Sequence, residues 1–257
     1  MENKKIIKSV QKSLQILKYI NAADGEVGIS ELQKALGFSA ATIHHLLQTL
    51  MAEGFVSQNE QTKKYDSGRE FFFVSLEHRR FEKFFARAMP YLQQLTEEAG
   101  ESSGIFIQSG WESICVLSAI TDRYLRAELR VGKRIPLYCT ATGKVFLAAM
   151  PADRLAAYFN NVNLAAYTPG TVTERDTVIK QIERVKKEGY GTEYEEYEEG
   201  INAAGVPLWG PNDKVIAVLT VVAPASRLPA QRVAELIPEL KKRGRCIAKT
   251  MASAIYY

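Results

Sequence analysis

The chain has 257 residues, 46% hydrophobic and 24% charged, which is typical of a globular protein with one large or two modest domains. Its net charge of +4 is too small by itself to indicate nucleic-acid binding, although residues 1–90 carry 13 Lys or Arg against 10 Asp or Glu. Three widely spaced cysteines, no secretory core and no apolar run of about 18 residues argue against a disulfide scaffold, a zinc site and a membrane span, and they predict a cytoplasmic protein with no metal and no cofactor.

Apolar residues at three- and four-residue spacing predict a first amphipathic helix over residues 9–22, with Ser9 as its N-cap. The residues that carry this spacing are Val10, Leu14, Leu17 and Ile20. Ser30 then suits the N-cap of a second helix, and Gly37 suits the tight turn that ends it. The first two helices are therefore short and closely connected.

A third helix and a hairpin follow. Ser39 suits the N-cap of the third helix, and Gly54 suits its end. Residues 55–57 and 65–66 are β-prone and flank a polar tip at 58–64, which predicts a hairpin. Helices joined by a glycine-containing turn and followed by a hairpin form a winged helix-turn-helix. We expect this DNA-binding domain to occupy residues 1–70.

Residues from about 70 to 99 have a helical pattern that is dense in phenylalanine. We expect residues 71–86 to form a linker helix that packs against the same helix of a second copy. Pro90 predicts a break, after which a further helix runs to Gly100.

The rest of the chain, residues 87–257, mixes strands and helices, which predicts an α+β domain with an antiparallel sheet. The expected strands are 104–107, 114–120, 125–131 and 215–222, with a turn at Ser109-Gly110 between the first two. The expected helices are 141–150, 174–188 and 229–255.

The third helix is the candidate recognition helix, which reads base edges from the major groove. Its candidate DNA-binding residues are Ser39, Ala40, Ala41, Thr42, His44, His45 and Gln48. Lys63 and Lys64 at the hairpin tip suit phosphate or minor-groove contacts. The alternative for the histidines and lysines is an ordinary solvated surface.

A second candidate site lies where the loop from Pro136 to Thr140 leads into the helix that begins at Ala141. Free amides at a helix start attract anions, and the Thr140 and Thr142 hydroxyls add donors. The alternative is a plain N-cap without a ligand. The acidic run 193–199 has no His or Cys neighbour, so we expect a solvated loop there rather than a metal site.

The N-terminal segments resemble the IclR-type transcription regulators. The resemblance lies in residues 9–17, 29–32 and 37–50, and it continues through Gly54-Phe55-Val56 and Tyr65. Members commonly have a Lys-Ser pair before the threonine and an Arg after the histidine, where this chain has Ala40-Ala41 and His45. The resemblance implies an operator-binding protein, and these departures from the family pattern weaken the phosphate contacts expected of its recognition helix.

The second half resembles the same family in residues 132–148, Gly189-Tyr190, Glu195-Glu196, Gly200-Ile201 and 215–224. The resemblance implies a GAF-like domain that binds small, often anionic acids. The positions it assigns to the effector are Thr140, Ala141, Glu193, Ala203, Thr220 and Val222. Some members have Cys and Ser where this chain has Ala203 and Val222. Leu125, Leu129 and Leu137, with Trp111 apart from them, could form an apolar wall or ordinary core.

The sequence thus predicts a non-enzymatic regulator that binds double-stranded DNA as a homodimer or a dimer of dimers, because one recognition helix reads only half of a two-fold operator. Two alternatives remain. Cys139 before a helix start could be the nucleophile of a hydrolase, but His44, His45 and His78 all lie in the N-terminal third. The chain could also be an architectural DNA binder with a non-functional sensor domain.

Overall fold

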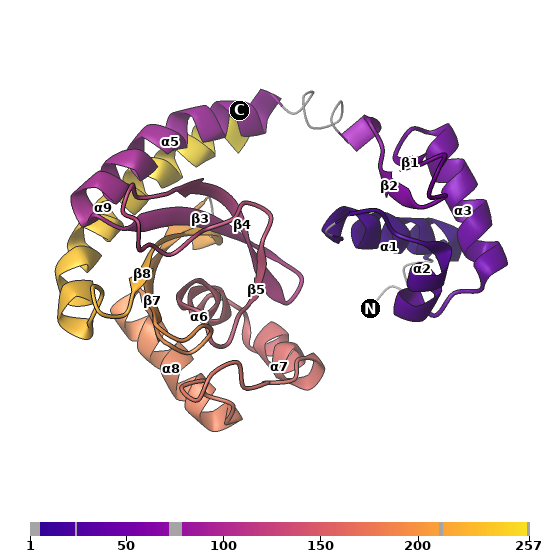
Figure 1. The fold of residues 1–257 in the computed structure, drawn as a ribbon. Coiled ribbons are helices and arrows are strands. Elements are labelled where there is room, and N and C mark those ends of the chain that lie inside the picture. Colours follow the sequence, from indigo (N-terminus) through magenta and orange to yellow (C-terminus); the bar gives the residue numbers. More distant parts are fainter. Residues whose placement is uncertain (1–5, 24, 72–78, 211–212, 256–257) are drawn as a thin grey trace. The chain divides into compact units, whose positions relative to one another are not determined.

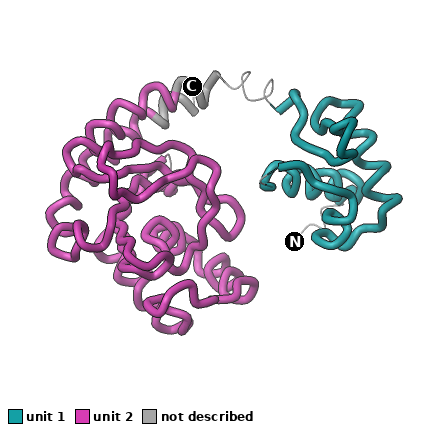
Figure 2. Tube along the Cα trace, in the orientation of Figure 1, with its two compact units in different colours: residues 1–79 teal, residues 80–257 magenta. Residues whose placement is uncertain are grey.

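The computed structural model describes residues 6–23, 25–71, 79–210 and 213–255. The chain divides into two compact units, residues 1–79 and 80–257 (Figure 2). Within the described ranges, no helix combines the length and apolarity needed to cross a membrane.

The first unit is a winged helix-turn-helix, as predicted. Its elements are α1 (Lys8–Ala22), α2 (Ile29–Leu36), α3 (Ala40–Ala52), β1 (Val56–Gln58) and β2 (Tyr65–Ser67). One apolar core, which includes Ile16, Leu32, Ile43 and Leu47, joins the three helices and the hairpin. Gly37 ends α2 with φ of 70°, a conformation that costs glycine little. This turn sets the angle between α2 and α3.

Two predicted N-caps are wrong. Ile7, rather than Ser9, precedes α1, and it makes no side-chain capping bond. Gly28 precedes α2, and its amide donates to the Glu31 carboxylate at 2.6 Å, so Ser30 lies inside the helix. The inward face of α1 also differs from the prediction, because Val10 and Leu14 are exposed.

The second unit is an α+β domain around one antiparallel sheet with strand order β5-β4-β3-β8-β7-β6. Its strands are β3 (Ser102–Ser109), β4 (Glu112–Ala119), β5 (Arg134–Pro136), β6 (Gly191–Tyr194), β7 (Ile201–Trp209) and β8 (Val215–Pro224). Its helices are α5 (Arg79–Ala99), α6 (Ala141–Ala148), α7 (Ala152–Asn161), α8 (Arg175–Glu188) and α9 (Ala230–Ile255).

Each face of the curved sheet has its own apolar core. Alternation along β8 sends Leu219 and Val221 to the outer face, where α5 and α9 run side by side, and Val218 to the inner face, which carries α6 (Figure 1). Two-sided burial explains why β8 is a continuous apolar run in the sequence.

The predicted break at Pro90 is wrong, because α5 continues through it. Ala88, Leu92 and Leu95 pack against the sheet on one face of α5, and this packing holds the helix together where the proline lacks its amide donor. Much of the predicted linker helix, residues 72–78, lies outside the described residues, and residues 79–86 form the start of α5.

The predicted strand at 125–131 is also wrong. Among the described residues, this segment pairs with no strand, and β5 occupies the edge beside β4. It is instead held by the Ser102 hydroxyl, which donates to the Ala127 carbonyl at 2.7 Å. Its alternating apolar residues are not all inward, because Leu125 and Val131 are largely exposed.

Candidate functional sites

Helix α3 presents a polar face opposite its core residues. Ser39 caps the helix, because its Oγ accepts from the Thr42 amide at 3.2 Å and lies 2.9 Å from Thr42 Oγ1. The remaining predicted DNA-binding residues of α3 are exposed: Ala40, Ala41, His44, His45 and Gln48. Helix α3 contains no Lys or Arg, so this face can read base edges but contributes little phosphate attraction.

The hairpin tip that carries Lys63 and Lys64 is held by short hydrogen bonds. The Glu26 carboxylate accepts from Asn59 Nδ2 at 2.5 Å and from Thr62 Oγ1 at 2.6 Å. Gln58 Nε2 donates to the Lys63 carbonyl at 2.9 Å. Both lysines are exposed, and Lys63 has a positive φ of 55°. The tip therefore presents two adjacent cations on an ordered turn.

In the second unit, strand register aligns three of the predicted effector residues. Glu193 on β6 lies opposite Ala203 on β7, Ala203 lies opposite Val222 on β8, and Val222 lies opposite Ser102 on β3. These four residues form one row across the inner face of the sheet.

A second row lies two residues further along the same face. It consists of Gly191, Gly205, Thr220 and Gly104. A Cβ atom on Gly191 would lie 2.3 Å from the Ala141 carbonyl oxygen, so the start of α6 packs directly on this row. Only glycine fits at position 191, because any side chain would collide with the Ala141 carbonyl. The absence of a side chain lets Ala141 lie against this row.

The start of α6 is capped by its own loop. Thr140 Oγ1 accepts from the Gly143 amide at 3.2 Å and donates to the Pro136 carbonyl at 2.6 Å. The Thr220 hydroxyl is likewise engaged, donating to the Ala204 carbonyl at 2.9 Å. Thr140, Ala141 and Thr220 are all buried. In this structure the predicted polar groups are therefore paired within the protein.

The Glu193 carboxylate occupies the anion position at the α6 start. Its Oε2 accepts from the Ala141 amide at 3.4 Å, and its Oε1 accepts from the Tyr197 amide at 3.3 Å. Glu193 is buried, and desolvation raises its pKa to about 7, although Lys144 opposes this rise. Glu193 is therefore partly protonated at neutral pH.

Lys144 and Glu196 form a buried ion pair beside Glu193. The expectation of a solvated loop over residues 193–199 is therefore wrong for Glu193 and Glu196, which are both buried. Lys144 Nζ lies 2.5 Å from Glu196 Oε1 and donates to the Thr192 carbonyl at 3.1 Å. Glu196 Oε2 is buried without a hydrogen-bond partner. The pair links α6 to the acidic run at 193–199 across 52 positions of sequence, which no local pattern could indicate.

The rest of the acidic run is a local turn. Glu195 Oε2 accepts from the Gly200 amide at 2.8 Å, and Glu198 and Glu199 are exposed. Among the described residues there is no group of three or more His, Cys, Asp or Glu that could hold a metal ion.

The predicted apolar wall is only partly assembled. Leu129 reaches the inner face, since a Cβ on Gly104 would lie 2.9 Å from its Cδ1. Leu137 is fully buried in the inner core, with Trp111 at the edge of that core. Leu125 does not join them, because 67% of it is exposed.

The surroundings of Cys139 do not support the hydrolase alternative. This cysteine is fully buried, and desolvation, with the nearby Glu193 and Glu196 carboxylates, raises the pKa of its thiol to about 12. A thiol that stays protonated at neutral pH is a poor nucleophile. Burial and the two carboxylates therefore argue against Cys139 as a nucleophile.

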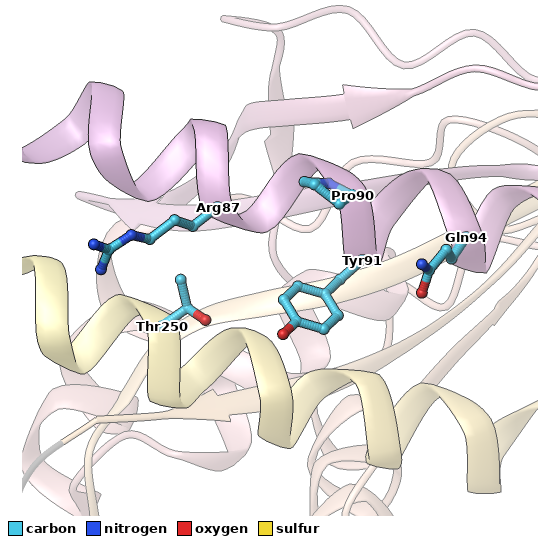
Figure 3. Close-up of a pocket in the computed structure, with 5 residues that line it drawn as sticks. All are labelled: Arg87, Pro90, Tyr91, Gln94 and Thr250. Carbon is cyan, nitrogen blue, oxygen red and sulfur yellow. The ribbon is translucent and has the colours of Figure 1, made fainter.

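A groove of about 410 Å³ lies between α5 and α9, on the opposite face of the sheet from α6 (Figure 3). Its lining residues are Arg87, Pro90, Tyr91, Gln94 and Thr250. None of the residues predicted to bind the effector lines it.

Glu193→Gln is expected to stabilise the second unit at neutral and alkaline pH. With the folded-state pKa raised from 4.5 to about 7, the stability contributed by this carboxyl is complete below pH 4.5 and is lost as the pH rises through 7. We expect the stability advantage of the variant to grow by about 2–3 kcal/mol over this window. Urea unfolding followed by tryptophan fluorescence measures it, because both tryptophans, Trp111 and Trp209, lie in the second unit. An advantage that is the same at both ends of the window would contradict the prediction.

Comparison with known families gives two matches. Residues 9–60 match the family described as "IclR helix-turn-helix domain". Residues 82–249 match "Bacterial transcriptional regulator IclR C-terminal". Together they cover most of both units.

Among curated proteins, the chain is similar to the HTH-type transcriptional regulators XynR and KdgR of Escherichia coli K12. It is 28% identical to XynR over 252 residues, which is 96% of this chain and 98% of XynR. It is 30% identical to KdgR over 249 residues, covering 95% of this chain and 93% of KdgR. A crystal structure of an IclR-type regulator from Silicibacter sp. TM1040 has the same fold, with a TM-score of 0.87, 24% identity and coverage of 95% and 96% of the two chains.

Proposed function

The chain belongs to the IclR family of bacterial transcriptional regulators, and we propose that it is a repressor that binds a two-fold operator as a dimer and responds to a small anionic acid. In this proposal residues 1–70 bind DNA, 71–86 connect the domains and 87–257 bind the effector. The proposal gives no catalytic role to any of the described residues.

The observation that carries the proposal is the exposed face of α3 beside a lysine-tipped wing. His44, His45 and Gln48 are exposed on α3, while Ile43 and Leu47 fix the helix from behind. Such a face suits base reading in the major groove. Since α3 carries no Lys or Arg, we expect Lys63 and Lys64 to supply much of the attraction to phosphate.

Support for the repressor assignment comes from the relatives. Several are named as repressors, among them the transcriptional repressor IclR of Escherichia coli K12 and the acetate operon repressor of Salmonella typhimurium. The relatives support neither the hydrolase nor the architectural alternative, because they are named as regulators and repressors. A dimer follows from the geometry of operators, since one α3 reads one half-site.

Support for the anionic effector comes from the α6 start. Its amides lie at the row of Glu193, Ala203 and Val222, and an acidic side chain already accepts from Ala141 there. A small acid of similar size suits the same donors.

The DNA half is tested by selecting duplexes from a random pool with the full chain and measuring the affinity of the selected duplex by fluorescence anisotropy. We expect tight binding of the selected duplex and binding of a scrambled duplex that is weaker by roughly 10³-fold or more. Equal affinity for both duplexes would overturn the proposal.

The double variant Lys63→Ala/Lys64→Ala is expected to weaken binding to selected and scrambled duplexes alike. If each lysine of both subunits neutralises one phosphate, the slope of log affinity against log salt should become shallower by about 3–4. Gln48→Ala provides the contrast, because loss of a base contact should reduce discrimination by about 1–3 kcal/mol and leave the slope unchanged. An unchanged slope in the lysine variant would show that Lys63 and Lys64 do not contact DNA phosphates.

A further inference from the structure

Glu193 holds the place that the proposed function gives to the carboxylate of an effector. Both of its hydrogen bonds are long, 3.4 Å from the Ala141 amide and 3.3 Å from the Tyr197 amide. Its neighbours across the sheet, Ala203 and Val222, offer no polar side-chain group. A ligand that reaches the Ala141 amide therefore competes with Glu193 for a weakly held donor.

The charged groups around Glu193 do not compensate the charge of a second buried anion. The titratable groups that act on it come from three elements: Lys144 on α6, Glu196 and Tyr197 on the acidic run, and Cys139 on the loop before α6. In the part of the chain that the structure describes, Lys144 is the one cation of this set, and it is already paired with Glu196 at 2.5 Å. An ionised Glu193 and an effector carboxylate would together place two unpaired negative charges in a buried space.

We propose that a small monocarboxylate takes the place of the Glu193 side chain at the α6 amides, and that Glu193 takes up one proton from solvent as it is displaced. The proton is added to a Glu193 carboxylate oxygen, no other covalent bond changes, and the net charge of the site is the same before and after binding. This inference rests on the proposed function, because it concerns the same effector site. It makes operator release sensitive to pH as well as to the acid.

Binding of acetate, lactate and benzoate to the full chain, at about pH 6 and about pH 8, tests the proposal by isothermal titration calorimetry. Glu193 has a pKa of about 7, so it is largely protonated at the lower pH and largely ionised at the higher one. The acid that binds best should therefore bind about tenfold more weakly at about pH 8. Its uncharged amide should not show this dependence.

Glu193→Gln should bind the acid with the same affinity at both pH values, because the side chain can no longer take up a proton. Glu198→Gln is the matched control, since it removes an exposed carboxylate of the same run and should keep the tenfold dependence. Retention of the dependence in Glu193→Gln would overturn the proposal.

Proton uptake can also be counted on the unmodified chain, so the proposal does not depend on the variant folding. Calorimetry at about pH 8 in HEPES and in Tris, which differ in ionisation enthalpy, should show nearly one proton taken up per acid bound. A count near zero would overturn the proposal, as would failure of all three acids to bind at either pH. The operator-selection experiment uses no acid, so its result does not depend on whether these acids bind.

Discussion

Lys144→Met is expected to destabilise the second unit by about 3–5 kcal/mol at neutral pH, because it leaves the Glu196 carboxylate buried without its partner. The Lys144 side chain is 3% exposed and that of Glu196 is 8% exposed. Water therefore cannot replace the ammonium group, and the carbonyl of Thr192 also loses its donor. Urea unfolding followed by tryptophan fluorescence measures the loss.

Two comparisons separate the ion pair from a general effect of the substitution. Lys242→Met removes a lysine that is 65% exposed and 3.3 Å from Glu239, and it should change stability by less than about 0.5 kcal/mol. The double variant Lys144→Met/Glu196→Leu should recover most of the loss, because apolar residues of similar volume can replace a buried pair. A double variant as unstable as Lys144→Met would show that packing, and not charge, explains the loss.

Gly143→Ala should have a comparable effect by a different route. A Cβ atom at this position would lie 2.2 Å from both Cα and the carbonyl oxygen of Leu137, and backbone cannot swing aside as a side-chain end can. The first turn of α6 would have to move away from its own loop, and Leu137 is fully buried. We expect a loss of about 3 kcal/mol, which exceeds the roughly 1 kcal/mol that alanine contributes in a helix.

Gly244→Ala is the matched control for Gly143→Ala, because it makes the same substitution inside helix α9. There the added Cβ would lie 3.3 Å from the ends of the Leu208 and Val206 side chains, which can adjust. Its stability should change by less than about 1 kcal/mol in either direction. Equal effects of the two substitutions would contradict the close approach at Gly143.

The helix-turn-helix could be predicted from sequence because its signals are local. Ser39 three residues before Thr42, and Gly37 in a left-handed turn, determine the start of α3 and the end of α2 within a few positions. The signals at Ser9 and Ser30 were misleading for a related reason. A serine near a helix start predicts a cap only if the helix begins directly after it, and both helices begin earlier. In α2 the Glu31 carboxylate accepts from the Gly28 amide, so the first turn includes Ser30.

The sequence does not predict strand β7, because the residue types in this strand depend on the start of α6, which packs against it. Ala203, Ala204 and Gly205 are small, and Pro207 lies within the strand, so neither size nor β-propensity marks it. The small residues are required because the start of α6 approaches the sheet there. A pattern that depends on a helix some 60 positions away cannot be read from the strand alone.

Part of the candidate effector site could likewise be predicted from the sequence, and part could not. The resemblance assigned Glu193, Ala203 and Val222, and strand register brings these three into one row. It did not indicate the pairing of Lys144 with Glu196, because the contact joins distant segments and depends on how α6 packs against the acidic run. The charge balance around Glu193 therefore becomes visible only in the folded chain.

We expect an acid bound in the second unit to change the affinity of the first unit for its operator. The most direct measurement is the Kd for the selected duplex, by fluorescence anisotropy, with and without a saturating concentration of the acid that binds best in calorimetry. We expect Kd to change by at least about fivefold, which is the lower end of ordinary allosteric coupling. A Kd that is the same with and without the bound acid would contradict it.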